Sequence, residues 1–269
     1  MAEGLFQYEY MRYAFACGAI IGVLCAIIGV YVILRGMSFL GVGISHSAIG
    51  GTAIGVAAGI PTELSAFVYC MLTVWIIGLL SSENRMKLDA AIGVLFAFSQ
   101  ALGIFIFSLT PTLRSDLNSY LFGSIVSVDL QQLVLSACAL LLIGAVLICV
   151  YRPLNSMIFD AEFAQVCGVR VTLLHYLLLL LTAVCVVCSM QIVGVLLVSA
   201  LIVIPASAAR LLFRTMKSLL FSSALFGALS CILGLVISYY TDTAPGPVIV
   251  LFSGFIFLAC WMLNRARQK

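Results

Sequence analysis

The chain has 269 residues, of which 64% are hydrophobic and only 9% are charged, with a formal net charge of +3. A soluble domain carries about 25% charged residues. This composition therefore excludes a water-soluble globular protein and indicates a chain that crosses a membrane several times. The small positive charge gives no reason to expect nucleic acid as a partner.

Apolar runs bounded by charged or turn-forming residues predict the membrane-spanning helices. They occupy residues 14–34, 45–60, 64–80, 90–109, 130–150, 173–205, 219–240 and 248–263. One crossing needs about 20 residues, so the run at 173–205 is long enough for two. We expect a tight turn near 190–194 to divide it.

Basic residues set the orientation of these spans. Arg152 and Arg170 precede the run at 173–205, and Arg210 and Arg214 follow it. Under the positive-inside rule both flanks are cytoplasmic, so the chain crosses twice between them. We expect an all-α polytopic membrane protein with about nine transmembrane helices, within a range of eight to ten, its N-terminus outside and its C-terminus inside.

The polar segment at about 152–170 is too patterned for a simple connector. Acidic and amide residues alternate there with Phe163 and other apolar residues at helical spacing, and Gly168 follows as a C-cap residue would. This pattern predicts a short amphipathic helix on the cytoplasmic side. A helix resting on lipid is the alternative. Asp160 and Glu162 make the polar face acidic, which favours docking of a cytosolic protein.

Missing motifs narrow the function. The chain has no G-x-x-x-x-G-K-[ST] loop, so ATP hydrolysis is expected in a separate subunit. It has no H-E-x-x-H and no G-x-S-x-G, and its two histidines, His46 and His175, cannot form a three-histidine zinc centre. We therefore expect a protein that is not an enzyme. His175, at the start of a span beside Thr172, is expected to serve in packing.

The span at 45–60 carries a small residue at every fourth position. These residues are Gly43, Ser47, Gly51, Gly55 and Gly59. Such a ribbon lets two transmembrane helices approach closely, because small side chains leave little between the two backbones.

His46 lies beside this ribbon. An ionisable side chain inside a membrane segment is a candidate functional residue, because it is costly there and must face protein or water. Neutral imidazole suits zinc, iron, copper and nickel. A role confined to hydrogen bonding a neighbouring helix is the open alternative.

Three blocks follow a family pattern in order along the chain. They read LRGMSFLGVGISHSAIGGTAIG, FDAEFAQVCGVRV and IVGVLLVSALIVIPASAARL, with weaker matches at SYLFGSIVSV and DTAPGPVIVL. Together they resemble the permease subunits of bacterial ABC importers for zinc and manganese. The resemblance implies one transmembrane permease domain over 1–269, in the bacterial cytoplasmic membrane.

The resemblance also implies partners and residue roles. The permease would pair with a second copy of itself, receive metal from an extracytoplasmic solute-binding protein and be driven by cytosolic ABC ATPase subunits. By position, Asp160, Glu162, Phe163 and Gly168 belong to the helix that couples the ATPase. His46 matches the histidine of the metal path. The metal is cargo, and no permanently bound cofactor is expected.

One position departs from the family pattern. Many members carry an aspartate one helical turn before the histidine, where this chain has Val42. Another oxygen would have to complete the metal site, and the candidates are Ser45, Ser47, Glu63 and Asp242. Loss of a hard oxygen ligand favours zinc slightly over manganese.

An ion-coupled secondary metal transporter without an ATPase partner is the alternative function. Such a transporter should carry carboxylates in the middle of its spans for proton or sodium coupling. Glu63 and Asp89 both lie at span ends. Their positions count against this alternative.

Overall fold

The structure of the chain is a computed structural model that describes residues 9–82, 86–109 and 128–267. All regular structure in these residues is helical, and nine of the helices are long and apolar enough to cross a membrane. The predicted all-α polytopic fold is therefore confirmed. That the chain forms one transmembrane domain over 1–269 stays a prediction.

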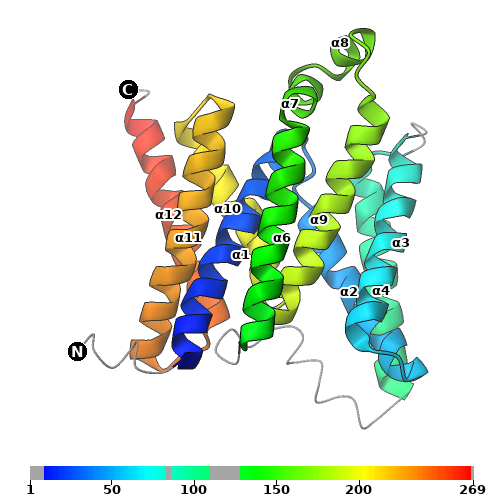
Figure 1. Ribbon diagram of the computed structural model, residues 1–269, viewed down its shortest axis with the longest axis vertical. Coiled ribbons are helices and arrows are strands. Elements are labelled where there is room, and N and C mark those ends of the chain that lie inside the picture. Colours follow the sequence, from blue (N-terminus) through cyan, green and yellow to red (C-terminus); the bar gives the residue numbers. More distant parts are fainter. Residues whose placement is uncertain (1–8, 83–85, 110–127, 268–269) are drawn as a thin grey trace. The chain divides into compact units, whose positions relative to one another are not determined.

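The helices of the described residues are shown in chain order by colour in Figure 1. They are α1 (Glu9–Leu34), α2 (Leu40–Ala58), α3 (Thr62–Ser82), α4 (Leu88–Leu109), α6 (Leu130–Cys149), α7 (Tyr151–Phe159), α8 (Ala161–Val166), α9 (Val171–Val193), α10 (Val195–Leu212), α11 (Met216–Thr241) and α12 (Pro245–Arg267). The two short helices, α7 and α8, project past the ends of the neighbouring long helices α6 and α9 (Figure 1).

The long apolar run at 173–205 is divided as expected. α9 ends at Val193 and α10 begins at Val195, with Gly194 between them at φ 85. This left-handed backbone conformation suits glycine, which has no β-carbon to clash. One glycine therefore converts a continuous apolar run into two crossings.

Two predicted boundaries were wrong. α2 begins at Leu40 and not at Ser45, because the turn at Gly36 (φ 70) already returns the chain and lets Leu40 and Gly41 enter the helix. The segment at about 152–170 forms two helices and not one. The backbone of Asp160 is extended (φ −154, ψ 105) and separates α7 from α8.

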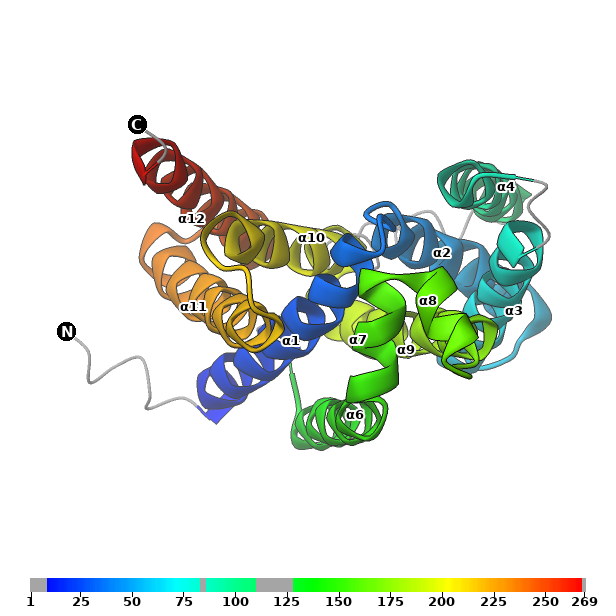
Figure 2. The same ribbon diagram turned by 90° about the horizontal axis from the view of Figure 1, so that it is seen from above.

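The contacts divide the chain into two compact units. Unit 1 comprises residues 1–33, 118–140 and 188–269. Within it α10, α11 and α12 pack on one another, as seen end-on in Figure 2. α1 and α11 meet at two glycines, since a β-carbon on Gly22 would lie 2.6 Å from the carbonyl oxygen of Gly227. Nearby, the Ser223 hydroxyl donates to the Ala26 carbonyl at 2.9 Å.

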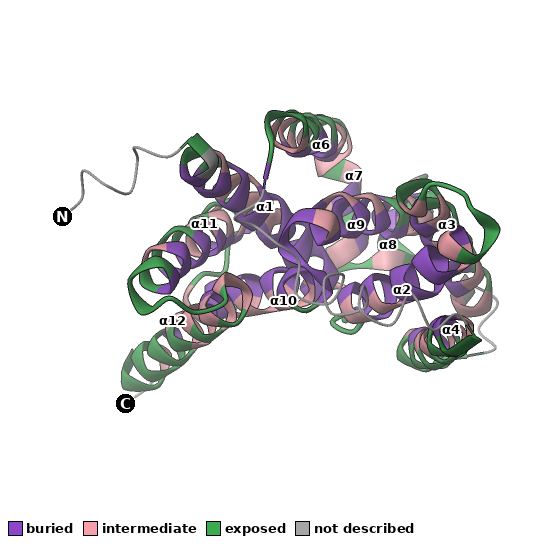
Figure 3. Cartoon of the chain, turned by 90° about the horizontal axis from the view of Figure 1, so that it is seen from below, coloured by how far each residue is buried: buried purple, intermediate pink, exposed green. Residues whose placement is uncertain are grey.

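Unit 2 comprises residues 34–117 and 141–187 and holds α2, α3, α4, α7 and α8 with parts of α6 and α9. α2 packs against both α3 and α4. Figure 3 shows α2 largely buried, whereas the outer sides of α3 and α4 are exposed. Unit 2 therefore carries both features that the sequence singled out, the histidine helix and the polar segment at 152–170.

Candidate metal path and coupling segment

The glycines of α2 bring two helices against it. A β-carbon on Gly51 would lie 2.7 Å from Cα of Ala66 in α3, and one on Gly43 would lie 2.5 Å from Cγ2 of Ile92 in α4. Distances under 3 Å mean that a larger residue would push the helices apart. The small residues therefore serve two neighbours, with Gly43 facing α4 and Gly51 facing α3.

The other members of the ribbon differ in their surroundings. A β-carbon on Gly55 would lie 2.8 Å from Cβ of Ser65 in α3. Gly59 ends α2 in the left-handed conformation, at φ 68, with open space around it. The Ser47 hydroxyl donates to the Gly43 carbonyl at 2.7 Å, which satisfies it within its own helix.

His46 lies on α2 and is half-buried. Its ring packs edge-on against Phe96 of α4, with 5.0 Å between the ring centroids. Its Nδ1 is buried and has no hydrogen-bond partner among the described residues. A buried polar atom without a partner costs about 1–3 kcal/mol, so this nitrogen is a candidate ligand atom.

A cavity of about 320 Å³ lies one helical turn from His46, between α2 and α4. Its lining consists of Phe39, Val42, Gly43, Asp89, Ile92, Gly93 and Phe96. Phe96 is thus shared by the cavity and the imidazole ring. Asp89 is the charged member of this described lining and stands in the first turn of α4.

Asp89 is the residue that sequence reasoning set aside. A signal was present, because Asp89, Ile92 and Phe96 recur at helical spacing and so share one face of α4. Nothing in the sequence says, however, that this face meets α2. Packing of the two helices supplies that information.

The predicted oxygen donors lie in different places. The Ser45 hydroxyl donates to the carbonyl of Val42, at 3.1 Å, and stays beside His46. Glu63 is exposed in the first turn of α3, which meets α2 near Gly55, about 13 Å along the helix from His46. Asp242 is the C-cap of α11 in unit 1. Among the described residues, no cluster of three or more histidine, cysteine or acidic side chains could hold a metal ion.

The coupling segment α7–α8 is organised by Asp160. Its Oδ1 accepts a hydrogen bond from the backbone N–H of Phe163 at 2.9 Å, which caps the first turn of α8. At the other end, Gly168 follows the helix at φ 85, and the N–H of Val169 donates to the Ala164 carbonyl at 3.0 Å. This is the glycine-dependent helix ending that the sequence predicts.

α8 presents large apolar side chains to solvent. Phe163 is 65% exposed and Val166 is 86% exposed, whereas Ala164 is buried and anchors the helix. Glu162 is exposed in the same first turn. An apolar surface outside the spans, edged by acidic groups, indicates a docking site for another protein.

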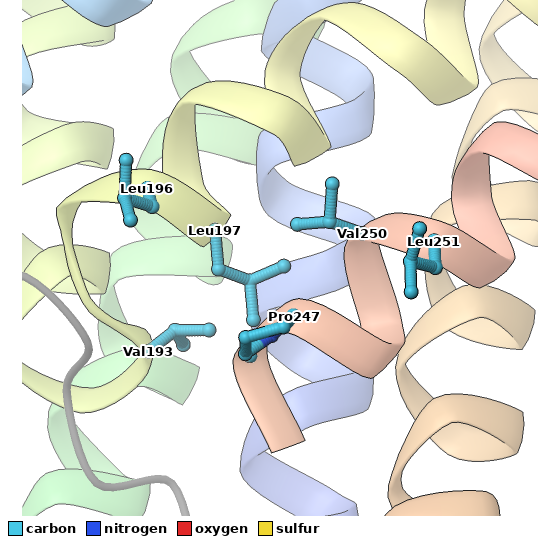
Figure 4. Close-up of a pocket in the computed structure, with 7 residues that line it drawn as sticks. Val193, Leu196, Leu197, Pro247, Val250 and Leu251 are labelled. Carbon is cyan, nitrogen blue, oxygen red and sulfur yellow. The ribbon is translucent and has the colours of Figure 1, made fainter. Parts of the chain in front are cut away.

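A second cavity, in unit 1, is of a different kind. It measures about 420 Å³ and lies beside the Gly194 turn and the start of α12. Its lining is aliphatic with one glycine, and Figure 4 shows Leu197 and Pro247 facing each other across it. The described lining carries no ionisable side chain, so this cavity does not suit a cation.

Nine helices long and apolar enough to cross a membrane, among the described residues, define a multi-pass membrane protein. The chain matches the ABC 3 transport family over residues 7–264 and belongs to that family. It is therefore the permease subunit of a metal ABC importer, a multi-pass protein of the bacterial inner membrane.

Individual relatives cover nearly the whole chain. A manganese transport system membrane protein, MntC of Halalkalibacterium halodurans, is 35% identical over 97% of this chain and 90% of its own length. A probable iron transport system membrane protein of Haemophilus influenzae is 32% identical over 98% of this chain and 97% of its own. Among solved structures, PsaBC from Streptococcus pneumoniae in complex with Fab gives a TM-score of 0.85 at 31% identity, covering 97% of this chain and 94% of that one.

Proposed function

We propose that this permease imports a divalent transition metal by alternating access, driven by ATP hydrolysis in a separate subunit. The observation that carries the proposal is α8, which exposes Phe163 and Val166 outside the spans of a chain without a phosphate-binding loop. Because the chain has no such loop, the energy of ATP hydrolysis has to enter through a partner subunit. α8 offers that partner an apolar surface outside the spans. A cytosolic ABC ATPase fits the family.

The cargo is a first-row divalent metal, with zinc and manganese as the two candidates. Relatives named for manganese and for iron support this class. Val42 supplies no oxygen ligand, which favours zinc, whereas the relatives named for manganese favour that ion. These two arguments oppose each other. Competition between zinc and manganese in one uptake assay identifies the preferred ion.

His46 is the proposed contact for the metal. Its Nδ1, buried and without a hydrogen-bond partner among the described residues, offers the ligand type that suits zinc, whereas manganese prefers oxygen ligands. We add Asp89 to the candidate oxygen donors, because its carboxylate lines the cavity that also contacts Phe96. A metal that leaves His46 would meet the Asp89 carboxylate, a hard oxygen ligand, in this cavity. Ser45 is next to His46 in α2, and Val42 and Gly43 line the same cavity.

The remaining partners are inferred from the family. A solute-binding protein would deliver metal at the outer face, and a second copy of the chain would complete the pathway. The ion-coupled alternative finds little support, since the described acidic residues that belong to the long helices, Glu9, Glu63 and Asp89, all stand in first turns. None of these three lies in mid-span.

The experiment is tracer uptake into proteoliposomes that contain the permease and its ATPase, with manganese and zinc offered separately and together. We expect uptake that requires hydrolysable ATP and is inhibited by the other metal. Equal uptake with a non-hydrolysable ATP analogue, or uptake that follows an imposed proton or sodium gradient without ATP, would establish the secondary transporter instead.

A further inference from the structure

Arg35 stands at the turn that leads into the histidine helix. The chain leaves α1 at Leu34 and returns through Gly36, whose φ of 70 permits the sharp reversal, to start α2 at Leu40. Nη1 of Arg35 donates to the carbonyl oxygen of Met157 in α7, at 3.4 Å. One side chain thus joins the turn between α1 and α2 to α7, the helix that precedes α8.

The guanidinium is half-buried, and burial lowers the pKa of Arg35 from its ordinary value. Arginine still keeps its charge in proteins. Its Nε is buried and makes no hydrogen bond within the part of the chain that the structure describes. The group therefore has one donor engaged by α7 and another donor free for a second partner.

Further unpartnered polar atoms belong to the elements around it. Oδ1 of Asn155 in α7 and Nδ1 of His175 in α9 are both buried without a hydrogen bond. Nε2 of His175 is 3.3 Å from Oγ of Ser81 in α3. Buried polar atoms without a hydrogen bond cost free energy in a rigidly packed helix. They are expected where polar groups change hydrogen-bond partners during a movement.

We propose that Arg35 is a positioning residue that passes movement of the coupling segment α7–α8 to α2. The inference rests on the proposed function, because it assumes that an ATPase moves α8. Arginine suits the task, since its long stem and rigid fork of donors can hold the Met157 carbonyl while the turn and α7 move together. His46 then changes its surroundings when α8 is displaced, although no side chain of α8 reaches it.

The test compares metal uptake with ATP hydrolysis in the same proteoliposomes of permease and ATPase. For Arg35→Gln, we expect ATP hydrolysis to continue while metal moved per ATP falls at least about fivefold, the lower end of usual coupling between sites. Arg35→Lys should recover part of the ratio, because an ammonium can still donate to the carbonyl. Arg210→Gln, which removes an exposed charge at the end of α10, serves as the control and should leave the ratio unchanged.

A wild-type ratio in Arg35→Gln, or an equal fall in the Arg210 variant, would overturn the proposal. Failure of the proposed function is separately visible, because wild-type vesicles would then show no ATP-dependent uptake at all. A purely structural role would lower the amount of assembled complex and leave the uptake per ATP of the remaining complex unchanged. That outcome also counts against the proposal.

A second measurement does not depend on the Arg35 variants. Ser38 in the turn and Ser156 on α7 are both exposed and accept spin labels after replacement by cysteine. We expect the distance between the labels within one protomer to stay constant with and without ATP. A change of more than about 2 Å, the scale of helix shifts in switching proteins, would show that the turn and α7 move independently and would overturn the proposal.

Discussion

α2 and α8 place their apolar residues in opposite environments. α2 is built from small residues and buries most of them against α3 and α4. α8 buries Ala164 and exposes Phe163 and Val166. Exposure inside a span is unremarkable, because lipid covers it, but outside the spans it needs a protein partner. The comparison therefore separates the helix proposed to form the pathway from the helix proposed to receive the partner.

The largest effect is expected at the docking helix. Phe163→Ala removes a large exposed side chain from the proposed centre of the ATPase interface, where such residues contribute about 2 kcal/mol or more. Affinity for the ATPase should fall about 30-fold. Binding is measured with purified subunits in detergent. Phe221→Ala, at a phenylalanine of similar exposure within α11, is the control and should bind normally.

The packing of α2 gives the next largest effect. Gly51→Ala would place a β-carbon 2.7 Å from the backbone of Ala66, and overpacking of this kind costs about 1–3 kcal/mol. The thermal midpoint of the purified permease should fall. Gly144→Ala in α6 meets no atom within 4 Å, so it should leave the midpoint unchanged or raise it. Equal behaviour of the two variants would remove the close-packing role of Gly51.

At the proposed metal contact, His46→Ala should raise the metal concentration needed for half-maximal uptake about tenfold or more, as losses at metal sites commonly do. The cause would be loss of the nitrogen ligand, with assembly intact. Thr52→Ala is the control on the same helix, because its hydroxyl donates to the Ile49 carbonyl within α2. Unchanged uptake at limiting metal would make His46 a packing residue.

The smallest effect concerns the cap of α8. Asp160→Ala removes the acceptor for the Phe163 N–H and should cost about 1 kcal/mol of helix stability. Affinity for the ATPase should then fall about fivefold, because α8 must be ordered to dock. Asp160→Asn keeps the cap and should retain most of the affinity. If the two variants bind equally poorly, the carboxylate charge and not the cap determines docking.

Much of the fold could be predicted because apolar runs and basic flanks report directly on span length and orientation. The division at Gly194 followed from the same reasoning. The start of α2 and the break at Asp160 could not be predicted so well. Both depend on local backbone geometry, at Gly36 and at the Asp160 cap, which hydropathy does not register.

The candidate site also contains residues that the sequence could predict and residues that it could not. His46 and the small residues around it are visible as a pattern within one helix. Asp89 and Arg35 are not, because their significance comes from neighbours far away in the sequence. Arg35 and Met157 are 122 positions apart, and only the contact of the α1–α2 turn with α7 and the packing of α2 against α4 bring the relevant groups together.

The most direct test of the account places His46→Ala and Phe163→Ala in the same reconstituted system and measures metal dependence and ATPase affinity for each. The account predicts a double separation. His46→Ala shifts the metal dependence and leaves ATPase affinity unchanged, whereas Phe163→Ala weakens ATPase affinity and leaves the metal dependence of residual uptake unchanged. If both variants shift both quantities alike, α2 and α8 do not have the separate roles assigned to them.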